Sequence, residues 1–183
     1  MRLMYLGFAA GIAMFAPTAM AQGPYKVLKT AKTGGLGGFD YIYADDAGRR
    51  LYIPRGAVQG DNPTPARVTV FNLDTLAPVG EIPNVRANGA AVDAKSGHGF
   101  ASSKPVAMWD AKTLAPIKTI DIDPKSSPDG ILADPFNQRI YVFSHSAAEP
   151  TVVNSCGGQV DASGCPSAFY RKSSGSRHTM EFR

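Results

Sequence analysis

The sequence predicts an all-β fold built from repeated four-stranded sheets. Its 183 residues are 44% hydrophobic and 19% charged, which is too apolar for a disordered chain and too evenly apolar for a protein with several membrane spans. Nineteen glycines and 14 prolines interrupt the chain often, so short strands are expected and long helices are not. The third observation is an internal repeat, which defines the strands one by one.

The first 21 residues are predicted to form a secretory signal peptide. Arg2 gives the positive start, residues 3–16 are a nearly uncharged apolar run, and Ala19-Met20-Ala21 has the small-x-small pattern of a cleavage site. The run is shorter than the ~18 to 20 apolar residues of a membrane helix, so no membrane span is expected after cleavage. We therefore expect a periplasmic or secreted protein, with residues 22–38 as a flexible lead-in.

The formal net charge of +4 is spread along the chain. Lys and Arg alternate with Asp and Glu instead of gathering in one stretch, as they do in most nucleic-acid-binding modules. The positive excess therefore indicates solubility, and nucleic acid is not an expected partner.

A pair of short strands recurs three times. Each pair starts with an Asp or Asn and passes through a polar turn into a second apolar strand. The three copies start at Asp40, Asn88 and Asp129, so 48 residues separate the first two copies and 41 separate the last two. Four-stranded repeats of about 40 to 45 residues are typical of β-propeller blades.

The second half of the repeat is visible in two copies. Residues 68–79 match residues 106–117 at a constant offset of 38, and both contain Thr-Leu-Ala-Pro in a turn short enough for a hairpin. These segments are the third and fourth strands of a blade. The expected strands are residues 40–45, 50–54, 68–73, 78–82, 89–93, 98–102, 106–110, 116–122, 130–134 and 139–144.

The third repeat is expected to stop at Asn154. Residues 151–154 take the place of a third strand, but residues 155–183 show no period of 2 or 3.6. We therefore expect a β-propeller fragment of about two and a half blades over residues 39–154, with the ring not closed, and an unstructured or non-native tail over 155–183. A reading-frame error and a natural unstructured C-terminus are the two origins considered for this tail. Open blade faces favour self-association.

The pattern from Pro128-Asp129-Gly130 through residues 139–142 to residues 151–154 resembles the YVTN-type repeat of YncE-like exported bacterial proteins. The resemblance covers roughly residues 35–154. It implies a ring that is typically seven-bladed, of which this chain supplies the N-terminal part. It also implies a binding or scaffold module, and the alternative is part of a propeller enzyme, either lactonase-like or a subunit of a quinone-linked dehydrogenase. No cofactor is predicted.

Antiparallel topology brings six polar residues to one rim, where each first strand begins and each second strand ends. In propellers of this type that rim commonly holds the site for a small molecule or a protein, so the six are the candidate ligand-binding residues. They are Asp40, Asn88, Asp129, Arg55, Lys104 and His145. In the alternative interpretation, the acidic and amide residues only bond turn backbone and the basic ones are ordinary loop residues.

No catalytic or metal-binding pattern stands out. His98, His145 and His178 are 47 and 33 residues apart, without carboxylates at ligand spacing. The glycine-rich residues 34–38 lack the strand, Lys-Ser/Thr and helix of a phosphate loop. Cys156 and Cys165 could form a disulfide in an exported chain.

Overall fold

The computed structural model describes residues 25–160. The chain divides into two units, residues 1–32 and 33–183, and the described part of the first unit contains no helix or strand. All eleven described strands belong to the second unit. Within residues 25–160 there is no helix, and thus none able to cross a membrane. The predicted signal peptide, residues 1–21, lies outside the described residues.

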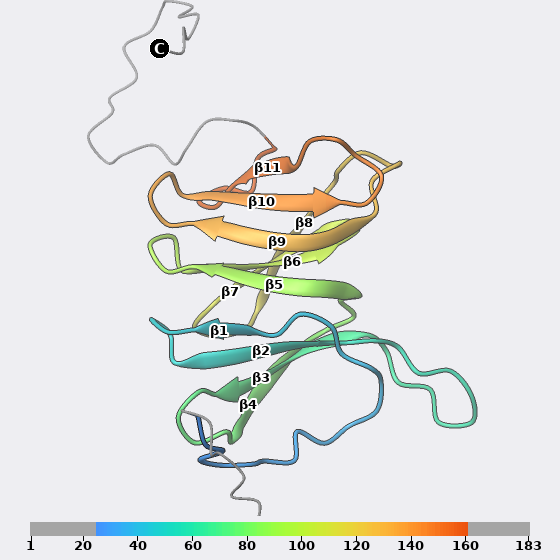
Figure 1. Ribbon diagram of the computed structural model, residues 1–183. Helices are drawn as coiled ribbons and strands as arrows, with labels where there is room; N and C mark the ends of the chain where they lie inside the picture. The colour runs from blue at the N-terminus through green and yellow to red at the C-terminus, as the bar shows by residue number, and fades with distance from the viewer. Residues whose placement is uncertain (1–24, 161–183) are drawn as a thin grey trace, which may run out of the picture. The chain divides into compact units, whose positions relative to one another are not determined.

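The strands form three antiparallel sheets in which the strands follow chain order, and we call these sheets blades 1, 2 and 3 (Figure 1). Blade 1 contains β1 (Tyr43–Asp45), β2 (Arg50–Arg55), β3 (Arg67–Asn72) and β4 (Pro78–Pro83). Blade 2 contains β5 (Ala87–Asp93), β6 (His98–Ser103), β7 (Val106–Asp110) and β8 (Pro116–Ile120). Blade 3 contains β9 (Pro128–Asp134), β10 (Arg139–Ser144) and β11 (Thr151–Asn154). The sheets stack face to face, and the three do not close a ring.

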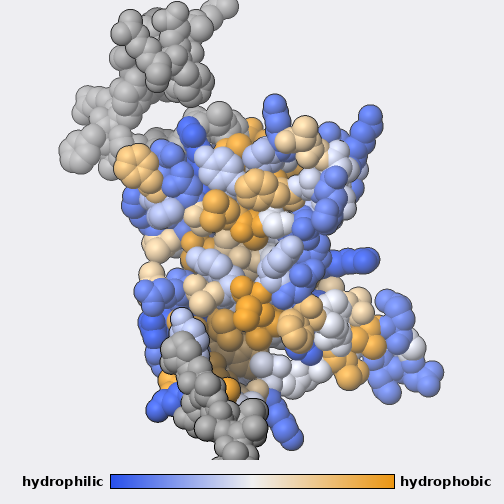
Figure 2. Space-filling model, in the orientation of Figure 1, coloured by the Kyte–Doolittle hydropathy of each residue, from blue (hydrophilic) through white to orange (hydrophobic). Residues whose placement is uncertain are grey.

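Two apolar clusters hold the stack together, one at each interface between blades. Successive side chains of a strand point to opposite faces, so neighbouring residues of blade 2 serve different interfaces. Phe100 packs in the cluster with blade 3, whereas Ala101 packs in the cluster with blade 1. Burying a large apolar side chain contributes roughly 1.5 to 3 kcal/mol. Figure 2 shows apolar groups gathered between the front strands, with polar groups along both sides.

Trp109 is the largest side chain in the cluster between blades 1 and 2. It is fully buried, and its ring lies 5.9 Å from the ring of Tyr52. On its own sheet it stands opposite Gly99, where an added Cβ would overlap the indole. Glycine at position 99 is therefore what lets the indole lie flat against β6.

The third strand of every blade ends in the same turn. An Asx side chain accepts the N–H groups two and three residues ahead, and the fourth residue ahead takes a positive φ while donating to the Asx carbonyl. The Asx residues are Asn72, Asp110 and Asn154, and the residues with positive φ are Leu76, Leu114 and Gly158.

The third repeat thus continues beyond Asn154, which differs from the expectation. Val153 pairs with Val160, seven residues later, just as Phe71 pairs with Pro78 seven residues later. The turn requires an Asx acceptor and a residue that tolerates positive φ, not the Thr-Leu-Ala-Pro sequence itself. The rest of the predicted tail, residues 161–183, lies outside the described residues.

The predicted fold class is confirmed: an all-β, partial β-propeller array with an unclosed ring. Strand positions agree to within a few residues, and the largest shift is in the first strand, which starts at Tyr43 instead of residue 40. Blade 3 has three described strands. The irregular loop after β2 contains one small closed turn, in which Val58 and Thr64 exchange two backbone hydrogen bonds of 2.9 and 3.0 Å.

Candidate functional site

The candidate site is built around the carboxylate of Asp129 at one rim of the stack. Asn88 Nδ2 donates to Asp129 Oδ1 at 3.1 Å, and the hydroxyl of Tyr41 donates to Asp129 Oδ2 at 3.4 Å. His145 Nε2 lies 3.3 Å from the same Oδ2. We call these four residues the rim cluster.

Local structure explains why these residues meet. Asn88 and Asp129 are each the second residue of an innermost strand, β5 or β9, and these strands contact each other. Tyr41 precedes β1 and is fixed by its own N–H, which donates to the carbonyl of Asn88 at 2.9 Å. The rim cluster therefore joins all three blades.

The charge of Asp129 acts on Tyr41. The nearby carboxylate of Asp129, and next that of Asp40, raise the pKa of the Tyr41 phenol above its usual value of 10.0. The phenol, which is protonated at neutral pH in any case, thus keeps its proton to a higher pH than an ordinary tyrosine. The side chain of Asp129 is 22% exposed and that of His145 is 71% exposed, so the His145 edge faces solvent and a charged pair forms there only when the imidazole is protonated.

Of the six predicted rim residues, the structure brings Asn88, Asp129 and His145 into direct contact. Asp40 is exposed beside Tyr41. Arg55 pairs with Phe39, the neighbour of Asp40, but its buried side chain donates to the carbonyls of Gly34 and Gly35 at 3.2 and 3.0 Å and not to the rim cluster.

Lys104 lines a polar hollow next to the rim cluster. Its Nζ donates to the carbonyls of Pro124 and Ser126 at 2.7 and 2.9 Å, which fixes the connection that leads into β9. The hollow, which we call the rim pocket, has a volume of about 370 Å³. Its lining residues are Arg86, Asn88, Ser102, Ser103, Lys104, Ser126, Ser127 and Pro128.

Sequence reasoning missed Tyr41 and the serines of the rim pocket. In the repeat alignment Tyr41 takes the place of Gly89 and Gly130, so the repeat conceals it. The serines come from the end of β6 and from the connection before β9, and only the folded sheets bring these two segments together.

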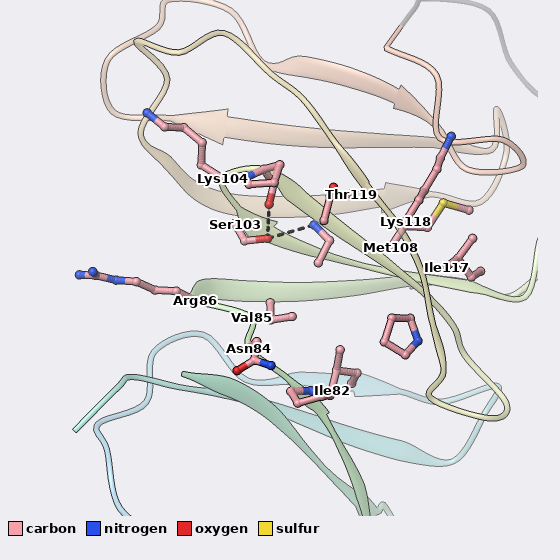
Figure 3. Close-up of a pocket in the computed structure, with 14 residues that line it drawn as sticks. Ile82, Asn84, Val85, Arg86, Ser103, Lys104, Met108, Ile117, Lys118 and Thr119 are labelled. Atoms are coloured by element: carbon pink, nitrogen blue, oxygen red, sulfur yellow. Dashed lines mark hydrogen bonds between the residues drawn. The ribbon is translucent and has the colours of Figure 1, made fainter. Parts of the chain in front are cut away.

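A second cavity, of about 390 Å³, lies between blades 1 and 2 (Figure 3). Ile82 and Val85 reach it from blade 1 and its connection, and Met108 and Ile117 reach it from blade 2. Ser103 is at its edge, where its hydroxyl donates to Pro105 O at 2.7 Å and accepts the N–H of Ala107 at 3.0 Å. The lysines at its edge turn away, since Lys104 and Lys118 donate to carbonyls outside the cavity. This cavity therefore offers apolar contact and few directed polar groups.

Within residues 25–160 there is no group of three His, Cys, Asp or Glu side chains able to hold a metal ion. His98 Nδ1 lies 2.8 Å from the carbonyl oxygen of Ser155 and thereby connects blade 2 to the last turn. Cys165 lies outside the described residues, so its pairing with Cys156 stays a prediction.

The fold has known counterparts. The β-propeller domain of Cps50 (Swd1) from Myceliophteria thermophila matches 69% of this chain with a TM-score of 0.50 at 13% sequence identity. The fold is that of a β-propeller. A chain of a nidogen–laminin complex matches 62% of this chain with a TM-score of 0.46 at 15% identity. This chain spans 38% and 42% of those two chains. No family model matches it, and no curated protein does.

Proposed function

We propose that this chain is a binding or scaffold module of an exported, YVTN-type propeller, and that the rim pocket takes a small anionic ligand such as a carboxylate. One observation carries the proposal: two cationic side chains, Arg86 and Lys104, flank a hollow whose other polar groups are serine hydroxyls and the Asn88 amide. The donors offered to an anion are the Arg86 guanidinium, the third N–H of Lys104 Nζ and the hydroxyls of Ser126 and Ser127. The Asn88 amide and the hydroxyls of Ser102 and Ser103 donate to groups of the protein itself.

The Asp129 carboxylate, which is the negative charge beside the rim pocket, already has hydrogen-bond partners. Asp129 accepts bonds from Asn88 and Tyr41 and faces His145, so its repulsion of an incoming anion is reduced. The two bonds of Lys104 to backbone carbonyls hold the pocket wall in place before a ligand arrives. A preorganised site loses less entropy on binding.

Calorimetric titration with succinate, citrate and phosphate tests the proposal. We expect saturable binding of at least one probe that Arg86→Ala weakens by roughly tenfold, the effect of losing one charged contact. Lys112→Ala is the matched control, because it removes an exposed positive charge from a hairpin away from the rim pocket. The absence of binding at millimolar probe, or an equal loss in both variants, would contradict the proposal.

A turnover assay distinguishes the binding proposal from the alternative that the chain is part of an enzyme. Lactones and redox dyes are offered to the chain with and without divalent metal. Turnover that Asp129→Ala abolishes would replace the binding proposal with a catalytic one. The predicted longer parent ring is a separate question, which the nucleotide sequence read in three frames beyond residue 183 answers.

A further inference from the structure

The face of blade 3 turned away from blade 2 is apolar and open. Leu132 is 55% exposed and Phe143 is 45% exposed, and Tyr141 lies between them only half-buried. Tyr52 and Phe100, which take the repeat position of Tyr141 in blades 1 and 2, are both 0% exposed. In blades 1 and 2 the following blade covers the aromatic residue at this repeat position, whereas in blade 3 the residue is left partly exposed.

A polar contact between successive blades also repeats along the chain. At the start of β2, Arg50 donates to the carbonyls of Ala111 and Lys112 in the hairpin of blade 2. At the start of β6, His98 contacts the carbonyl of Ser155 in the corresponding turn of blade 3. A basic residue thus joins each blade to the turn after the third strand of the next blade.

Arg139 occupies this position at the start of β10. Its Nε is buried and has no hydrogen-bond partner among the described residues. A buried donor without an acceptor costs roughly 1 to 3 kcal/mol, so an acceptor for Arg139 Nε would be stabilising. Blade 3 therefore has both the apolar face and the basic residue with which blades 1 and 2 contact the following blade.

The matching face is present in the same chain, on blade 1. Within the chain, β5 lies against blade 1 and β9 lies against blade 2, so the first strand of each following blade makes the contact. Ala90 and Val92 of β5 are 4% and 7% exposed, whereas their repeat counterparts Ile42 and Ala44 are exposed, Ile42 by 59%.

Only part of that face is open. Ile53 and Phe71 are already 6% exposed, so the free part of blade 1 is its first strand together with the hairpin after β3. In that hairpin, Leu73 and Asp74 take the repeat positions of Ala111 and Lys112 and offer the two carbonyls. The Asp74 carboxylate, 55% exposed, is already paired with Arg49, so the two backbone carbonyls are the acceptors offered to Arg139.

We propose that the outer face of blade 3 docks blade 1 of a second copy of this chain, head to tail, with Arg139 donating to the hairpin carbonyls of Leu73 and Asp74. Two copies of the three described blades give six, within the range of about four to eight seen in closed propellers. Such a head-to-tail contact closes into a ring when the rotation permits, here with two identical interfaces. This proposal does not depend on the rim pocket.

Light scattering on the full chain tests it. We expect the mass of a dimer, and a dissociation constant that rises at least about tenfold in Tyr141→Asp and in Arg139→Ala, as expected for residues at the centre of an interface. Ile117→Asp is the matched control, because Ile117 is 46% exposed on β8 of blade 2, which takes no part in the proposed contact. Unchanged circular dichroism confirms that each variant is folded.

A photo-crosslinker at Leu132 identifies the partner face. We expect crosslinks to residues 40–45 or 73–76 of the second copy. Crosslinks from blade 3 to blade 3 would overturn the proposal. So would a monomer at roughly 100 µM chain, since a concentration of this order saturates interfaces of micromolar affinity. A dimer equally stable in Tyr141→Asp and in Arg139→Ala would also overturn it.

Discussion

Replacing Gly99 by Ala tests the packing between blades 1 and 2. A Cβ at position 99 would overlap the indole of Trp109, which is fully buried against Tyr52 and has no free direction in which to move. Overpacking a tight core costs about 1 to 3 kcal/mol, and the reduced chain entropy of Ala offsets about 0.4 to 1 kcal/mol of this. Because the added Cβ would lie 2.2 to 2.5 Å from three indole atoms, the cost falls in the upper part of that range, and the net expectation is a loss of about 1 to 2.5 kcal/mol in the free energy of unfolding.

Urea unfolding followed by far-ultraviolet circular dichroism measures this loss. Gly38→Ala is the matched control, because an added Cβ there meets nothing within 4 Å, and it should leave stability unchanged or slightly raised. With Trp109→Leu in the background, Gly99→Ala should cost almost nothing, since the two positions are coupled through direct contact. If Gly99→Ala were neutral or stabilising in the wild-type chain, the packing argument would be refuted.

Three further predictions follow from other contacts. Ser155→Ala should lower the free energy of unfolding by about 1 to 3 kcal/mol, because the buried hydroxyl donates to Asp93 Oδ2 at 2.5 Å; urea unfolding checks this, and a neutral result would show that Asp93 does not need this donor. Hydrogen bonds lower the pKa of two carboxyls: the Thr113 N–H is the main donor to Asp110, and the Asn137 side chain is the main donor to Asp134. Both carboxylates therefore stabilise the folded state above pH ~4, and this stabilisation is lost as the pH falls through their pKa in the folded state. The urea midpoint should drop between roughly pH 6 and pH 3, and it should drop less in Asp110→Asn. Tyr41→Phe removes one exposed hydrogen bond to Asp129 and should leave the urea midpoint nearly unchanged, while the phenol titrating above pH 10 disappears from the ultraviolet absorbance titration.

The repeated strands could be predicted from the sequence because the pattern depends on local rules. A short run of mostly apolar or small residues follows a basic residue in β2, β6 and β10, and an Asx turn follows each third strand, so an alignment of the chain with itself locates the blades. The turn after Asn154 could not be predicted in this way. It keeps the hydrogen bonds of the other two turns while sharing almost none of their sequence, because Gly158 supplies the backbone conformation that Leu76 and Leu114 adopt elsewhere.

The candidate site was only partly predictable. Topology placed Asn88, Asp129 and His145 at one rim, and the structure joins them. Arg55 follows the same strand logic but turns to the other face of blade 1, where the glycine carbonyls of residues 34 and 35 accept its hydrogen bonds. Which face a long side chain covers depends on the segment that packs there, and that packing is not encoded in the strand pattern.

Hydrogen–deuterium exchange on the full chain tests the central claim, that three stacked blades share one repeated architecture. The account predicts the slowest amide exchange in β6 and β7, which are buried between two neighbouring blades, intermediate exchange in β2 and β10, and fast exchange in residues 56–66. Exchange in β6 and β7 as fast as in residues 56–66 would contradict it.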